Sequence, residues 1–198
     1  PFSPEFEAKH AQFVKIVKEM IPSCIPSNVV YITVNKDNVR KSGMMIPGDS
    51  IPDRMDISLA NRNDISKSEM MMLEIIANNN FERPVYMSTT VGTSNYGSLY
   101  RHFVQEGIAY RITPFSFEDN QAMVNSVIDT DKMYDNMMNK YAYGNLKQEG
   151  LYLDETTIRM CYTHRRWFSA LINALVEEGK YDKALKALEK CDAEIPAY

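Results

Sequence analysis

The alternation of short apolar runs with helical segments is the feature that most constrains this fold. Residues 29–34 are β-branched and apolar on both faces, which is typical of a central strand. Residues 55–60 alternate between apolar and polar side chains, and apolar runs recur at 85–89 and 108–112. Residues 66–77 have helical spacing and begin with a capping box. Strand–helix–strand units with short loops favour parallel neighbours. We therefore predict an α/β fold, with a small mixed or mostly parallel sheet and flanking helices.

The last third of the chain is predicted to be helical. Asp129 caps one helix, a long helix covers residues 154–178, and Gly179 separates it from a last helix that begins at Tyr181. Residues 168–196 fit one tetratricopeptide-like hairpin, in which two antiparallel helices carry large and small apolar residues at set positions. Those positions are occupied by Phe168, Leu171, Ala174, Leu175, Gly179, Tyr181, Ala184, Leu188 and Pro196. One such unit does not make a solenoid. Either further repeats exist outside the chain or the hairpin docks on the α/β part, and we favour docking.

These patterns divide the chain into three parts. Residues 1–24 are predicted to form an N-terminal helix, residues 25–118 the α/β domain, and residues 119–198 the helical region with its terminal hairpin. The chain begins with Pro1, and its first residues lack the basic and apolar regions of a signal peptide. We therefore expect it to be a piece of a longer protein that carries its targeting segment upstream.

Composition excludes several classes of protein. Apolar residues make up 44% of the 198 residues and charged residues 24%, which is ordinary for a globular domain. The formal net charge of −4 argues against nucleic acid as a partner. No apolar run approaches the ~20 residues of a membrane span. The three cysteines form no C-x-x-C pair and the three histidines have no metal-ligand spacing, so we predict no metal and no cofactor.

The loop after the strand at 85–89 is the first candidate site. It precedes a helix expected over residues 98–106, and anions bind at such strand-to-helix loops in α/β folds. It matches neither a P-loop nor a nucleophile elbow. Because no Lys or Arg lies between Val85 and Tyr100, we expect a neutral polar ligand on which Tyr96 stacks. The alternative is a glycine-permitted turn that only caps a helix. The predicted ligand-binding residues are Thr90, Gly92, Thr93, Ser94, Asn95 and Tyr96.

A second candidate surface lies on the long helix. Arg165, Arg166 and Trp167 are basic and aromatic neighbours that suit a partner or an acidic group, and a solvated helix face is the alternative. We predict no catalytic residues. A Ser94–His102 pair would be the basis of an alternative, a small hydrolase.

Three stretches carry a family resemblance: residues 73–86 with the run Asn-Asn-Asn-Phe-Glu-Arg-Pro, residues 90–92, and residues 106–111 with Glu-Gly-Ile-Ala-Tyr-Arg. They resemble a bacterial family of multi-pass membrane proteins of unknown function. That family is similar to protein O-mannosyltransferases of the C-type glycosyltransferase fold. The resemblance implies a membrane half upstream, followed by an extracytoplasmic region that ends in tetratricopeptide-like helices. In such enzymes the catalytic acid lies in the membrane half, so none is assigned to this chain.

We therefore expect a non-catalytic accessory domain of a membrane glycosyltransferase-like protein at the periplasmic face of the inner membrane. Its partners would be its own upstream membrane domain and a protein acceptor or glycan. An enzyme in the full-length parent would have its catalytic residues outside this chain. The other hypotheses are a tetratricopeptide-type interaction module without sugar binding, and the hydrolase.

Overall fold

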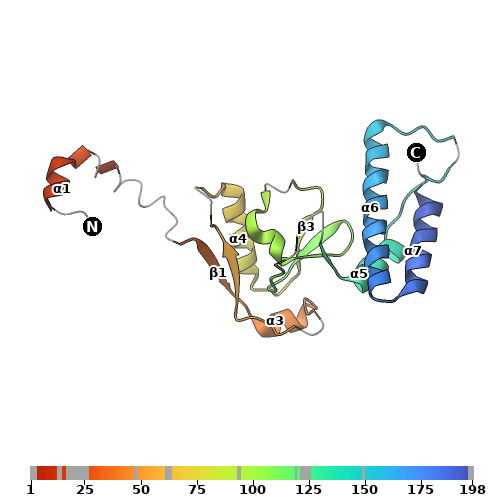
Figure 1. Cartoon of the computed structure of the whole chain (residues 1–198), viewed down its shortest axis with the longest axis horizontal. Coiled ribbons are helices and arrows are strands. Elements are labelled where there is room, and N and C mark those ends of the chain that lie inside the picture. The colour runs from red at the N-terminus through yellow and green to blue at the C-terminus, as the bar shows by residue number, and fades with distance from the viewer. Residues whose placement is uncertain are drawn as a thin grey trace.

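The computed structural model describes residues 4–12, 15–16, 27–46, 49–60, 64–92, 95–118, 120, 126–148 and 150–195. The chain folds into helices and two small sheets, with a long helical hairpin at one side (Figure 1). The helices are α1 (Pro4–Lys9), α3 (Lys36–Lys41), α4 (Lys67–Asn79), the 3₁₀ helix η3 (Gly97–His102), α5 (Thr130–Asp135), the π-helical η4 (Asn136–Lys140), α6 (Glu155–Glu177) and α7 (Tyr181–Glu194). The strands are β1 (Val29–Thr33), β2 (Arg54–Ser58), β3 (Val85–Ser88), β4 (Phe103–Gln105), β5 (Ala109–Ile112) and β6 (Val127–Ile128).

The strands form two sheets, and most neighbours are antiparallel. β1 pairs with β2, and a second sheet has the order β3-β5-β4-β6, in which β4–β6 is the one parallel pair among the described strands. The predicted α/β class with a mixed sheet is therefore confirmed. The expectation of parallel neighbours is wrong for β1–β2, β3–β5 and β4–β5.

The antiparallel pairing of β4 with β5 follows from the structure of residues 97–107. The helix predicted over 98–106 is instead a single 3₁₀ segment, η3, and the chain then continues directly into β4. Gly107 turns the chain with φ +116°, a conformation that favours glycine, so β4 and β5 form a hairpin. A parallel pair would need a crossover of a dozen or more residues, and no such length separates β4 from β5.

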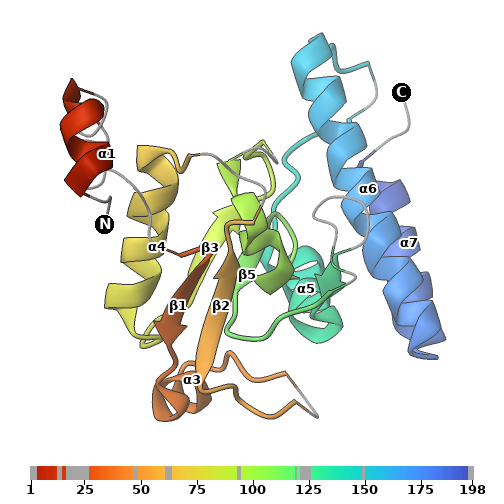
Figure 2. The same ribbon diagram turned by 60° about the vertical axis from the view of Figure 1, so that its left-hand side comes forward.

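The first hydrophobic core is formed by side chains from the two sheets, α3, α4 and η3. The predicted capping box is present, because Ser66 accepts a hydrogen bond from the Glu69 amide while the Glu69 carboxylate accepts one from the Ser66 amide. α4 then packs on one flank of β1 and β2 (Figure 2). The buried members of this core include Val39, Met44, Met55, Phe81, Leu99, Phe103 and Tyr110.

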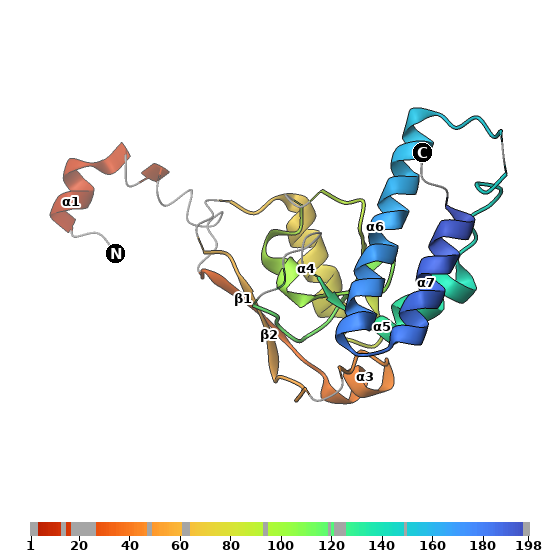
Figure 3. The ribbon, with the colours of Figure 1, turned by 45° about the vertical axis from the view of Figure 1, so that its right-hand side comes forward.

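The second core lies between α5, α6 and α7. α6 and α7 run side by side as an antiparallel hairpin, with α5 at its foot (Figure 3). Gly179, at φ +72°, ends α6 in a Schellman arrangement, in which the Lys180 amide donates to the Leu175 carbonyl at 2.8 Å. The interior is filled by Met133, Met137, Phe168, Leu171, Leu175, Ala187 and Ile195. The predicted C-terminal helical hairpin is confirmed, and its likeness to a tetratricopeptide unit stays a prediction.

The N-terminal part is described only in pieces. α1 and the helical residues 11–12 and 15–16 agree with a helix there, and α1 lies apart from both cores in Figures 1 and 3. The rest of the predicted helix over 1–24 lies outside the described residues. Across the described part of the chain, no helix combines the length and apolar character that crossing a bilayer requires.

Candidate functional site

The loop after β3 does not form the predicted stacking site. Tyr96 is only 1% exposed, its hydroxyl donates to the Val91 carbonyl at 2.7 Å, and its ring packs edge-on against Phe103. Burial raises the pKa of this hydroxyl. The expected stacking of Tyr96 on a ligand is therefore wrong, because the ring belongs to the first core.

The surroundings of Tyr96 also leave little room for a ligand. Tyr96, Gly97 and Ser98 line a hollow of about 10 Å³, the space of roughly one water. The short 3₁₀ segment that follows does not offer the N-terminal dipole of a long helix. Thr90, Gly92 and Asn95 are exposed, whereas Thr93 and Ser94 lie outside the described residues.

His102 is held by the fold. Its ring is 2% exposed, with Nδ1 2.8 Å from the Phe115 carbonyl oxygen and Nε2 3.3 Å from that of Asp56. Burial lowers the pKa of His102, and the carbonyls of Asp56 and Phe115 partly oppose that shift. The shorter contact favours the tautomer in which Nδ1 carries the proton and donates. The Nδ1 hydrogen bond thus ties η3 to the chain after β5, and nothing in this geometry supports the hydrolase.

The motif at 106–111 forms a buried ionic network. Arg111 is 1% exposed, its Nε lies 2.8 Å from Glu106 Oε1, and one of its terminal nitrogens donates to the Gly43 carbonyl at 2.7 Å. The Nε–H does not point at Glu106 Oε1, so this contact is an ion pair without a well-directed hydrogen bond. The other terminal nitrogen is 3.4 Å from Asp129 Oδ2, and Lys132 Nζ is 3.3 Å from Glu106 Oε1.

Tyr86, from the run at 73–86, completes this network. Its hydroxyl donates to Glu106 Oε2 at 2.8 Å, and burial together with that carboxylate raises the pKa of Tyr86 to about 12. Upstream in the same run, Asn80 ends α4 in the left-handed conformation and Phe81 is buried. The sequence that carries the family resemblance therefore joins the sheet to α5 and has a structural role.

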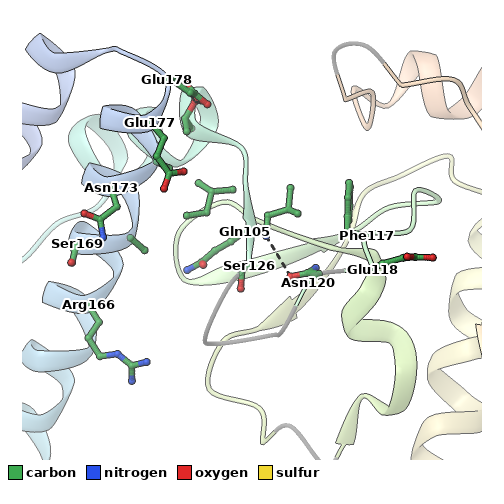
Figure 4. Close-up of a pocket in the computed structure, with 15 residues that line it drawn as sticks. Gln105, Phe117, Glu118, Asn120, Ser126, Arg166, Ser169, Asn173, Glu177 and Glu178 are labelled. Atoms are coloured by element: carbon green, nitrogen blue, oxygen red, sulfur yellow. Dashed lines mark hydrogen bonds between the residues drawn. The ribbon is translucent and has the colours of Figure 1, made fainter.

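A cleft of about 840 Å³ lies between α6 and the β4–β6 end of the sheet (Figure 4). One wall is a single face of α6, because its residues recur every three or four positions. They are Arg166, Ser169, Ala170, Asn173, Ala174 and Glu177. The opposite wall comes from β4, β6 and the chain around residue 120. It includes Gln105, Phe117, Glu118, Asn120, Ser126, Val127 and Ile128.

The wall opposite α6 has a fixed polar surface. The Asn120 amide nitrogen donates to the carbonyls of Tyr100 and Phe103, at 2.7 and 2.8 Å. The Gln105 amide nitrogen donates to the Gly107 carbonyl at 3.0 Å. Ser126 differs, because its Oγ is buried and has no hydrogen-bond partner among the residues that the structure describes.

The charge of the cleft favours a neutral or basic ligand. Arg166 faces an excess of carboxylates, from Glu118, Glu177 and Glu178. A phosphate would therefore be poorly neutralised. Among the described residues no group of three His, Cys, Asp or Glu side chains is arranged to hold a metal ion. Among the described residues that line this cleft, Phe117 is the one aromatic side chain.

The three predicted partner-binding residues separate in space. Arg166 lines the cleft, whereas Arg165 donates to the Ile195 carbonyl and lies 3.8 Å from Asp192 on α7. Trp167 is 9% exposed and packs edge-on against His164. A smaller hollow of about 70 Å³ touches both Arg166 and Trp167. Of the predicted cluster, Arg166 therefore lines the cleft, Arg165 connects α6 to α7 and Trp167 belongs to the second core.

Ser169, Asn173 and Glu177 are cleft residues that are not among the predicted site residues. Their signal was present, since small and polar residues recur at helical spacing opposite the apolar stripe of Phe168 and Leu171. The other wall has no such signal, because Asn120 contacts β4, through the Phe103 carbonyl, only in the folded sheet.

One family model matches the chain: TMEM260-associated domain 2, over residues 5–132. No curated protein and no solved structure matches it. The matched range includes both sheets and the buried Glu106–Arg111 network, and it ends within α5. The chain therefore belongs to the TMEM260-associated domain 2 family and is tied by it to a TMEM260-like membrane protein.

Proposed function

We propose that this chain is a non-catalytic, extracytoplasmic accessory domain of a membrane glycosyltransferase-like protein, and that it binds an acceptor protein or glycan in the α6–β6 cleft. The family match supports the link to a membrane protein. The glycosyltransferase-like parent and the periplasmic location rest on the resemblance of residues 73–86 and 106–111. The tetratricopeptide-like end belongs to the same proposal. The observation that carries the binding role is the cleft itself, with its volume of about 840 Å³.

The chemistry of the cleft supports binding more than group transfer. Its amides from Gln105 and Asn120 are held by backbone carbonyls, so they provide a fixed polar wall and no proton exchange. Ser169 and Asn173 on the α6 wall are exposed and offer a hydroxyl and an amide to a ligand. Pockets with fixed shape and a few convergent polar groups are typical of ligand sites.

The test is an NMR titration of the ¹⁵N-labelled chain with two probes, mannotriose and a pool of random heptapeptides. We expect amide signals from Gln105, Ser126, Ser169 and Asn173 to shift with at least one probe. The variant Asn173→Trp should abolish those shifts, because the indole fills the cleft from the α6 wall.

Val176→Trp is the matched control. Val176 is 44% exposed on the same helix, three residues further on, and does not line the cleft. This variant should bind as the parent chain does. The proposed function is wrong if neither probe shifts the cleft signals, or if Asn173→Trp and Val176→Trp weaken binding equally.

A second candidate function is the interaction module, and the outer face of α7 favours it. Tyr181, Leu185 and Leu188 lie at helical spacing and are 67%, 56% and 53% exposed. Such a stripe suits an amphipathic helical partner. Titration with an amphipathic Leu/Lys helical peptide would then shift signals of α7, and Leu185→Glu would remove the shifts while Asn173→Trp would not. Unshifted α7 signals would exclude this function for that class of peptide.

A further inference from the structure

The edge of the sheet at β6 lies in the cleft. β6 is the terminal strand of the order β3-β5-β4-β6, and no described strand pairs with its other side. The Asp129 amide donates to the Gln105 carbonyl, and the Val127 amide lies 3.4 Å from Asn120 Oδ1, so both point toward the β4 side. Because backbone groups alternate along a strand, the N–H and C=O of Ile128 point to the open side. An open strand edge is a template for a further strand.

The α6 wall has the length and the small side chains that an extended chain needs. Arg166 and Glu177 are eleven residues apart, which is about 16 Å along a helix. At about 3.3 Å per residue, a strand of roughly five residues spans that distance. Ala170 and Ala174 have short side chains, so the backbone of a bound segment can approach α6 between Arg166 and Glu177. Ser169 and Asn173 lie next to these two alanines on the α6 wall, and their side chains can hydrogen-bond to peptide groups.

The lining favours a peptide over a glycan. Sugar sites use aromatic faces for stacking, and the described lining of this cleft has one aromatic side chain, Phe117. The smaller hollow of about 70 Å³ shares Gln105, Arg166 and Ala170 with the cleft and is also lined by Trp167 and Tyr110. It offers a partly apolar recess for one small side chain of the bound segment. Glu177 and Glu118 suit a basic residue in the same segment.

We infer that the ligand of this cleft is an extended polypeptide segment of about five residues, neutral or basic, which pairs with the open edge of β6 and lies against α6. This inference rests on the proposed function, since it names the ligand class of the same cleft. Main-chain hydrogen bonds to Ile128 supply affinity, and the α6 wall selects side chains. This domain then binds its acceptor protein through an extended backbone segment, and the sugars of the acceptor do not contribute to recognition.

The test begins with a heptapeptide selected by phage display against the 198-residue chain, with counter-selection on Asn173→Trp. Each peptide bond of the selected heptapeptide is then N-methylated in turn, and affinity is measured by calorimetry. The described edge of β6 offers the C=O of Ile128 as its outward acceptor, so strand addition predicts one sensitive peptide N–H, the one that donates to this carbonyl. Methylation at that position weakens binding by about tenfold, the cost of a lost hydrogen bond, and methylation at the two adjacent positions changes affinity little.

A protein variant gives the reciprocal result. Ile128→Pro removes the outward N–H at an edge position where proline is tolerated. It should lower the affinity for the peptide by a similar factor and leave the circular dichroism spectrum unchanged. If this variant does not fold, the methylation scan decides by itself. Peptide binding that no single methylation weakens, or binding of mannotriose alone, overturns the inference and leaves the proposed function standing. If neither probe binds the cleft, the proposed function fails.

Discussion

Removing the charge of Arg111 should destabilise the protein more than any other single charge removal in the β5–α5 network. Its guanidinium group is 1% exposed and lies between Glu106, Asp129 and the Gly43 carbonyl. In Arg111→Met the aliphatic stem is kept, so the packing of β5 changes little. The Glu106 side chain, only 5% exposed, then stays buried with Lys132 as its remaining cation. The perturbation is therefore mainly electrostatic.

The expected cost is about 3 kcal/mol, the lower end of the 3–5 kcal/mol typical for breaking a buried ion pair from one side. The lower end applies because Lys132 Nζ remains 3.3 Å from Glu106 Oε1. The assay is urea denaturation followed by circular dichroism and by the fluorescence of Trp167, the chain's single tryptophan. Trp167 reports on the second core, and the network joins that core to the sheet through α5. Both signals should therefore move to lower urea together.

Two variants control this prediction. Arg54→Met removes a pair of nearly equal length, 2.9 Å between Arg54 Nε and Asp56 Oδ1, but the side chains are 59% and 48% exposed. Its cost should be about 1 kcal/mol or less. Adding Glu106→Gln to Arg111→Met should restore part of the loss, because no buried charge is left uncompensated. Equal costs for Arg111→Met and Arg54→Met would refute the reasoning from burial.

Three further predictions follow from buried groups. Ala184→Leu should cost about 1–3 kcal/mol by overpacking the α6–α7 interface, where Ala184 is 4% exposed, and an unchanged urea midpoint would contradict that packing. Tyr96→Phe should cost about 1 kcal/mol for the lost hydrogen bond to Val91, without affecting peptide affinity; a loss of affinity with the stability intact would reinstate the loop as a site. Burial lowers the pKa of both His102 and His164 below 6.5, so the unfolded chain binds more protons. Stability measured in urea should fall as the pH drops through 6.5 toward those lower values, and a profile that is flat between pH 7.5 and 5.5 would contradict it.

Residue patterns predicted only part of the candidate site. Arg166 was found because a basic and aromatic cluster is visible in the sequence, but the same cluster contains Arg165 and Trp167, which face α7 and the second core. Helical spacing distinguishes such neighbours only when the buried face is known. The glycine loop shows the opposite failure. Its composition suited a ligand, and the burial of Tyr96 placed its ring in the core.

The sequence by itself determined the local structure where short-range physics decides it. The capping box of Ser66 and Glu69, the Asp154 cap of α6 and the left-handed Gly179 are all formed by neighbours within a few residues. Amphipathic spacing over 155–194 likewise determined the hairpin, because each helix has one apolar face to bury.

Only the tertiary structure decided the strand pairing, the ionic network and the cleft. Residues 98–106 have no strong preference for helix or strand, and the pairing of β4 with β5 selected the strand. That hairpin brings Glu106 to Arg111, and β6 then joins β4 across about twenty residues of chain, which leaves its outer edge facing α6. These contacts join segments distant in sequence, and their energies depend on burial, which no local pattern contains.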